Sequence, residues 1–137
     1  VSINYLAVLV AAIAQYALGA LWYSVLFGKQ WMKLNGMEKM DPKKMEEMKK
    51  GVMWSYAGGL VSSLVMAYVL AHFVDYTEAA TAAAGAVAGF WIWLGFIATV
   101  TLGMVLWENK PFKLYLLNNA YNLLGLVIMG AILAVWV

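Results

Sequence analysis

Four long apolar stretches, separated by short polar segments, dominate the pattern of the chain. They cover residues 3–27, 52–74, 79–107 and 112–137. At about 1.5 Å per residue, each is long enough as a helix to cross a hydrocarbon layer of about 30 Å. The pattern therefore predicts an all-α polytopic membrane protein, in which four transmembrane helices form an up-down bundle within a single domain.

Composition supports the same interpretation. Of the 137 residues, 65% are hydrophobic and only 12% are charged, and the mean hydropathy is +0.78. A chain of this size could not bury so much apolar surface in water, so we expect the lipid bilayer to be its main partner.

The charges are distributed unevenly between the connections. All nine basic residues are lysines, and they lie in residues 28–51 and 108–113, whereas the second connection carries only Asp75 and Glu78. By the positive-inside rule, the two lysine-bearing connections are cytoplasmic. We therefore expect a multi-pass protein of the bacterial inner (plasma) membrane with both termini outside.

The first connection contains a segment with helical periodicity at residues 41–51. Asp41 can cap a helix that starts at Pro42, and Met45, Met48 and Val52 then share one face. We expect this amphipathic helix to lie on the cytoplasmic surface of the membrane, with its lysines near anionic headgroups.

Two alternatives for this connection stay open. The pairs Met37/Met40 and Met45/Met48 have thioethers of the kind that suit Cu(I), although no cysteine or histidine accompanies them. The helix could also be a docking surface for a partner protein.

Uncharged polar side chains of the spans fall at one depth, between the midplane and the cytoplasmic interface. In hydrocarbon each needs a hydrogen-bond partner. They form either an interhelical network, with bonds of about 0.6 to 2 kcal/mol, or the floor of a water-filled cavity open to the cytoplasm. This candidate polar layer consists of Gln15, Tyr23, Ser24, Tyr56, Thr99, Thr101, Asn118, Asn119 and Asn122.

Small residues recur at four-residue intervals within the spans, which lets helix backbones approach closely. This pattern predicts a tight bundle and is compatible with a homo-oligomer or with a membrane-protein partner. The rows are Ala11 with Gln15 and Gly19, Gly58 with Ser62, Gly59 with Ser63, Gly85 with Gly89, and Gly95 with Thr99 and Gly103.

We expect no cofactor and no metal site. His72 and Asp75 are three residues apart near the outer end of the second span and could share a hydrogen bond. They are weak candidates for binding a cation, because one histidine and one acid do not complete a metal site.

Aromatic motifs flank the cytoplasmic ends of the first and third spans. Their main residues are Trp22, Trp31, Trp107, Glu108 and Lys110. The segment from Gly19 to Trp22 also resembles that from Gly103 to Trp107, as in transporters built from two parallel hairpins. Chance placement of interfacial aromatics explains the match equally well.

The residues 19–31, the run Trp107-Glu-Asn-Lys-Pro111 and the segment 118–122 together resemble an uncharacterised bacterial family of four-helix membrane proteins, domain of unknown function 1761. The resemblance covers nearly the whole chain. It implies the four-helix fold and brings no activity with it.

The sequence lacks the motifs of common enzymes, with no phosphate loop, no histidine cluster and no paired carboxylates within the spans. We therefore do not expect an enzyme, nor a nucleic-acid-binding protein, because topology accounts for the lysines. The favoured interpretation is a small oligomeric permease or channel for a neutral or weakly polar solute. The alternative is a non-catalytic accessory or scaffold subunit of a membrane complex.

Overall fold

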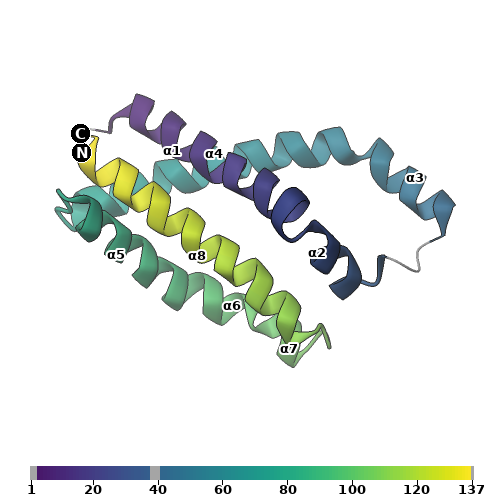
Figure 1. Ribbon diagram of the computed structural model, residues 1–137. Coiled ribbons are helices and arrows are strands. Elements are labelled where there is room, and N and C mark those ends of the chain that lie inside the picture. Colours follow the sequence, from purple (N-terminus) through teal and green to yellow (C-terminus); the bar gives the residue numbers. More distant parts are fainter. Residues whose placement is uncertain (1–2, 38–40, 137) are drawn as a thin grey trace.

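The computed structural model describes residues 3–37 and 41–136 (Figure 1). Within this part the chain is helical and contains no strand, so the prediction of an all-α protein is confirmed. The elements are α1 (Tyr5–Leu21), the π-helix η1 (Trp22–Leu26), α2 (Gly28–Leu34), α3 (Pro42–Lys50), α4 (Val52–Tyr76), α5 (Ala82–Ile92), the π-helix η3 (Trp93–Ala98), α6 (Thr99–Thr101), α7 (Gly103–Leu106) and α8 (Phe112–Val135).

Four continuous helical segments are long and apolar enough to cross a membrane, as the hydropathy pattern predicts. They cover Tyr5–Leu26, Val52–Tyr76, Ala82–Leu106 and Phe112–Val135. Side-chain caps set two of their starts. The Asn4 side chain accepts hydrogen bonds from the amides of Leu6 and Ala7, and the Thr81 hydroxyl accepts one from Ala84, so the third segment starts later than residue 79.

Both described ends of the chain lie at the same end of the bundle, beside the turn between α4 and α5 (Figure 1). There the Asn4 side chain donates a hydrogen bond of 3.5 Å to the carbonyl of Trp136. We call this the termini end. The opposite end, with α2, α3 and the connection between α7 and α8, bears the lysines, and we call it the lysine end.

The closest helix contact joins α5 to α8. A Cβ added at Gly85 would collide with the carbonyl of Gly130, and one added at Gly89 would collide with the carbonyl of Leu126. The backbones therefore touch through these glycines, which is how helices pack in a solvent as apolar as they are. The row of Gly85 and Gly89 thus serves packing within the chain.

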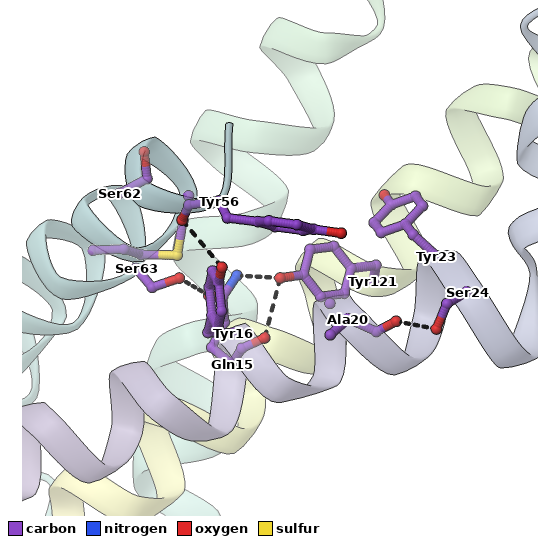
Figure 2. Close-up of a pocket in the computed structure, with 12 residues that line it drawn as sticks. Gln15, Tyr16, Ala20, Tyr23, Ser24, Tyr56, Ser62, Ser63 and Tyr121 are labelled. Carbon is purple, nitrogen blue, oxygen red and sulfur yellow. Dashed lines mark hydrogen bonds between the residues drawn. The ribbon is translucent and has the colours of Figure 1, made fainter. Parts of the chain in front are cut away.

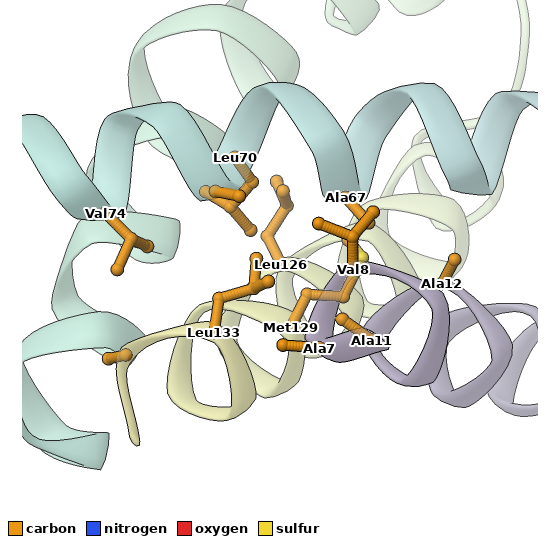
Figure 3. Close-up of a cluster of buried hydrophobic side chains, with 12 residues drawn as sticks. Ala7, Val8, Ala11, Ala12, Ala67, Leu70, Val74, Leu126, Met129 and Leu133 are labelled. Carbon is orange, nitrogen blue, oxygen red and sulfur yellow. The ribbon is translucent and has the colours of Figure 1, made fainter. Parts of the chain in front are cut away.

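The apolar core fills the termini half of the bundle. Its members come from α1, α4 and α8 (Figure 3). Helix α8 itself lies between α1 and α5 (Figure 1). The first half of α4 differs, because none of residues 52–62 is buried. The core consists of Ala7, Val8, Ala11, Ala12, Ala67, Leu70, Ala71, Val74, Leu126, Met129, Leu133 and Ala134.

Helix α3 extends from the lysine end and is exposed apart from Met45. The side chain of Asp41 accepts a hydrogen bond of 3.2 Å from the amide of Lys43 and caps the helix, with Pro42 at its first position. Two methionine pairs were considered for Cu(I), Met37/Met40 and Met45/Met48. Met40 of the first pair lies outside the described residues.

Candidate functional site

A cavity of about 760 Å³ lies between α1, η1 and the first half of α4, with Tyr121 of α8 at its back (Figure 2). Its inner end is at Gln15 and Ser63, near the middle of the segments Tyr5–Leu26 and Val52–Tyr76. From there it extends toward Ser24 and Tyr56, so it occupies the lysine half. The lining consists of Gln15, Tyr16, Gly19, Ala20, Tyr23, Ser24, Tyr56, Gly59, Ser62, Ser63, Met66 and Tyr121.

Three side chains from three helices close the inner end, which we call the floor. The Gln15 amide donates a hydrogen bond of 2.6 Å to the Tyr121 hydroxyl. That hydroxyl donates in turn to the Gln15 backbone carbonyl, at 3.1 Å. The Ser63 hydroxyl donates to the side-chain carbonyl of Gln15. The floor therefore ties α1, α4 and α8 together through polar groups that satisfy one another.

Two glycines make room for the floor. A Cβ at Gly19 would come within 2.6 Å of the Tyr121 hydroxyl oxygen, and one at Gly125 would lie 3.0 Å from Cγ of Gln15. Any larger residue at Gly19 would displace Tyr121. The small-residue row of Ala11, Gln15 and Gly19 thus accommodates a side chain of α8 as well as helix packing.

Tyrosine rings form much of the cavity wall. The Tyr16 hydroxyl donates to the backbone carbonyl of Tyr56, at 3.0 Å, which joins α1 to α4. The Tyr23 hydroxyl donates to the side-chain oxygen of Asn118, at 2.8 Å. The Tyr23 ring also meets the Tyr121 ring edge-on, with centroids 5.3 Å apart. The wall is thus largely aromatic, and the hydroxyls of Tyr16 and Tyr23 are already hydrogen-bonded to the protein.

The π-helix η1 carries Tyr23 and Ser24 into the cavity. Trp22, which precedes them, is only 8% exposed, and its indole N–H donates to the carbonyl of Leu117, at 3.2 Å. Gly28, just after the π-helix, lies close to the Tyr23 carbonyl. A Cβ there would come within 2.9 Å of that oxygen, so a glycine fits best at this position. Short π-helical segments occur frequently at functional sites.

The candidate polar layer divides into two groups instead of forming one. Gln15, Tyr23, Ser24 and Tyr56 line the cavity, and Asn118 is held against it by Tyr23.

The remaining members lie elsewhere. The Asn119 amide donates to the Thr101 hydroxyl, at 3.0 Å, and joins α8 to α6. Thr99 is exposed and donates to the carbonyl of Gly95 in η3, one turn earlier in the same apolar segment. Asn122 is half-buried and is not part of the lining. Depth along the helices located these residues, but depth does not distinguish between helix faces.

Four polar residues of the lining were not among the predicted site residues. Ser62 and Ser63 were interpreted only as small residues for packing, and Tyr16 and Tyr121 were not selected. A usable signal exists for Ser63, because it lies at the middle of its span as Gln15 does. Two uncharged polar residues at the same depth are candidates for a mutual hydrogen bond.

The aromatic motifs at the lysine end have unequal surroundings. Trp31 is half-buried and meets the Tyr23 ring edge-on, with centroids 6.0 Å apart. Trp107, in contrast, is 84% exposed, and Glu108 and Lys110 are exposed beside it. Since Trp22 is buried, Trp22 and Trp107 are not structurally equivalent, which argues against the weak internal repeat.

His72 and Asp75 do not form the hydrogen bond considered for them. Nδ1 of His72 instead lies 2.9 Å from the carbonyl of Tyr68. Asp75 borders a smaller cavity of about 430 Å³ at the termini end. Across residues 3–37 and 41–136, no three or more His, Cys, Asp or Glu side chains gather as a metal site would need.

A family model described as "Protein of unknown function (DUF1761)" matches residues 6–134, as the aromatic motifs predicted. No curated protein and no solved structure matches the chain.

Proposed function

Because the chain belongs to the DUF1761 family, whose function is unknown, we propose its activity from the cavity: it is a small membrane permease for a neutral or weakly polar solute. The observation that supports this proposal is a cavity of about 760 Å³ that reaches the middle of the spans and is lined by uncharged polar groups. Small-molecule sites have volumes of about 300 to 1,000 Å³. Among the described residues, the lining includes no lysine, acid or histidine, which favours a solute without charge.

The packed termini half would hold the permease closed on that side. Beyond the floor, the core residues Leu70, Leu126 and Met129 are almost fully buried. Passage therefore requires the floor to open and the core residues beyond it to separate. The bonds of the floor are those of Gln15 with Ser63 and Tyr121, and such interhelical bonds are worth only about 0.6 to 2 kcal/mol each. Thermal motion can break bonds of that strength.

The lysines support an orientation for this path. In our proposal the lysine end faces the cytoplasm of a bacterial cell, since positively charged connections stay on that side of the inner membrane. The cavity then opens from the cytoplasmic half, and both termini lie outside.

Flux measurements test this function. We would reconstitute the protein in liposomes and follow glycerol, urea and uracil by stopped-flow light scattering or radiolabel. We expect faster flux than in empty liposomes for at least one solute. Gln15→Leu should abolish the difference, because it replaces the amide that a polar solute meets at the inner end of the cavity with an apolar side chain that cannot hydrogen-bond to it.

Asn122→Leu is the matched control, since it also replaces an amide side chain with leucine, in a half-buried residue outside the lining. It should keep the flux. Wild-type liposomes no faster than empty ones for all three solutes would reject a permease.

The accessory-subunit alternative rests on a different observation. A Cβ at Gly58 or Gly95 would meet no described atom within 4 Å, so the helix surface at these two glycines has room to pack against another protein or a second copy. A stoichiometric partner that co-purifies in mild detergent, combined with absent flux, would favour this role. Flux from the purified protein alone would favour the permease, and its mass in detergent would give the oligomeric state.

A further inference from the structure

The hydroxyl hydrogens around the cavity are largely committed to the protein itself. A carbonyl oxygen carries no hydrogen, so any hydroxyl bonded to one must be the donor. Tyr16 donates to the carbonyl of Tyr56, and Ser24 donates to that of Ala20. Neither hydroxyl has a hydrogen left for a solute, but each keeps lone pairs that can accept one.

The same logic fixes the floor. Tyr121 donates to the backbone carbonyl of Gln15, so it must accept from the nitrogen of the Gln15 side chain. This determines which way the amide points. The amide oxygen then faces Ser63, which must donate to it. The hydroxyl hydrogens of Tyr121 and Ser63 are therefore also committed.

Among the polar lining residues, this leaves more acceptors than donors. Tyr23 donates to Asn118 as well. Within the part of the chain that the structure describes, the uncommitted hydrogens of this lining are those of the Tyr56 and Ser62 hydroxyls and one amide hydrogen of Gln15. A solute that only accepts hydrogen bonds would find few partners, whereas one that donates could use the lone pairs of several hydroxyls.

The wall adds a preference for shape. Four tyrosines contribute to the lining, Tyr16, Tyr23, Tyr56 and Tyr121, and Figure 2 shows their rings gathered around the cavity. Aromatic rings favour flat partners, which they meet by offset stacking or edge-to-face contact.

We propose that the cavity selects a planar, uncharged molecule that donates hydrogen bonds through N–H or O–H groups, such as a lactam heterocycle. This inference rests on the proposed function, because it names the solute class of the same site. It goes further in separating donors from acceptors among neutral molecules of similar shape.

A graded series of probes tests it. Uracil has two N–H donors, 1-methyluracil has one, and 1,3-dimethyluracil has none, while all three are flat and uncharged. The cavity of about 760 Å³ has ample space for two extra methyl groups. Binding would be measured by equilibrium dialysis against lipid nanodiscs with the protein, and empty nanodiscs would correct for partition into lipid.

We expect uracil to bind most tightly and each lost donor to raise Kd by about three- to tenfold, because an acceptor in the cavity is left unpaired. Equal affinity across the series, tighter binding of 1,3-dimethyluracil, or no binding of uracil would overturn the proposal.

A matched pair of serine variants links the selectivity to the cavity. Ser24 lines it and donates to the carbonyl four residues earlier. Ser55 makes the same kind of bond, to Gly51 at 3.3 Å, outside the lining. Ser24→Ala should reduce the Kd ratio between 1,3-dimethyluracil and uracil by about threefold, whereas Ser55→Ala should leave it unchanged. A merely structural effect would move both Kd values together, and an unchanged ratio in Ser24→Ala would count against the proposal.

Binding and flux separate the two proposals. Graded binding without flux would support the solute class and reject the permease. Flux of glycerol or urea without graded binding would support the permease and reject the solute class.

Discussion

The side-chain amide of Gln15 donates a 2.6 Å hydrogen bond to the hydroxyl of Tyr121, across 106 positions of the chain. This bond joins the middle of the first membrane helix to the last. The same hydroxyl donates back to the Gln15 backbone carbonyl, so one tyrosine pairs with the Gln15 amide, which needs a partner within the apolar bundle, and adds a second bond to a carbonyl of α1.

Removing that hydroxyl should weaken the fold. We expect Tyr121→Phe to lower the free energy of unfolding by about 1 to 2 kcal/mol, because the Gln15 amide loses its acceptor. Unfolding by SDS in mixed micelles measures this. Tyr76→Phe is the control, since Tyr76 is 64% exposed, and it should be neutral. Equal stability of the two variants would contradict the floor described above.

The glycine contact between α5 and α8 should tolerate no larger residue. In Gly85→Ala the new methyl group would overlap the Gly130 carbonyl and lie 2.6 Å from Cβ of Ala134. Overpacking of this kind costs about 1 to 3 kcal/mol. Gly58→Ala makes the same change where no atom of the described residues lies within 4 Å of the new methyl group. We expect it to be neutral or slightly stabilising in the same unfolding assay, and a loss as large as that of Gly85→Ala would argue against the contact.

The turn between α4 and α5 should gain stability from a glycine. Glu78 has φ 56°, a left-handed conformation that costs an ordinary residue about 1 to 2 kcal/mol. Glu78→Gly should therefore raise the free energy of unfolding by about 0.5 to 1 kcal/mol, because glycine adopts this conformation without strain. Asn109 has φ 55°, and asparagine tolerates it better, so Asn109→Gly should gain less. A destabilised Glu78→Gly would refute the assigned turn.

Single cysteines can establish the orientation, because the natural chain has none. In intact bacterial cells, a membrane-impermeant maleimide should label Glu78→Cys at the termini end. It should label Lys44→Cys on α3 only after the membrane is permeabilised. The opposite pattern would reverse the proposed topology and place the cavity in the outer half.

Hydropathy was sufficient to predict the four membrane helices, because lipid requires long uninterrupted apolar helices and leaves few alternatives. The contact between Gly85 and Gly130 was harder to predict from the sequence. Spacing identified Gly85 and Gly89 as a row, but the facing residue depends on how α5 and α8 meet, which no local pattern determines.

The residues that line the cavity could likewise be predicted only in part. Gln15, Tyr23, Ser24 and Tyr56 were selected by depth and line it, whereas Thr99 has a similar depth and lies exposed on another face. The rotation of each helix about its own axis decides between these outcomes. Rotation follows from packing between helices, and helices this uniformly apolar carry little amphipathic signal to indicate it.

The uncharged lining has a further consequence for energetics. Moving one elementary charge through a membrane potential of 100 mV changes the free energy by about 2.3 kcal/mol. Within residues 3–37 and 41–136, no lysine, acid or histidine lines the cavity, so opening the floor formed by Gln15, Ser63 and Tyr121 displaces no formal charge through that field. Transport by the proposed permease would therefore be electrically silent. Its rate would be the same in energised and in depolarised cells, and the direction of flux would follow the concentration gradient of the solute alone.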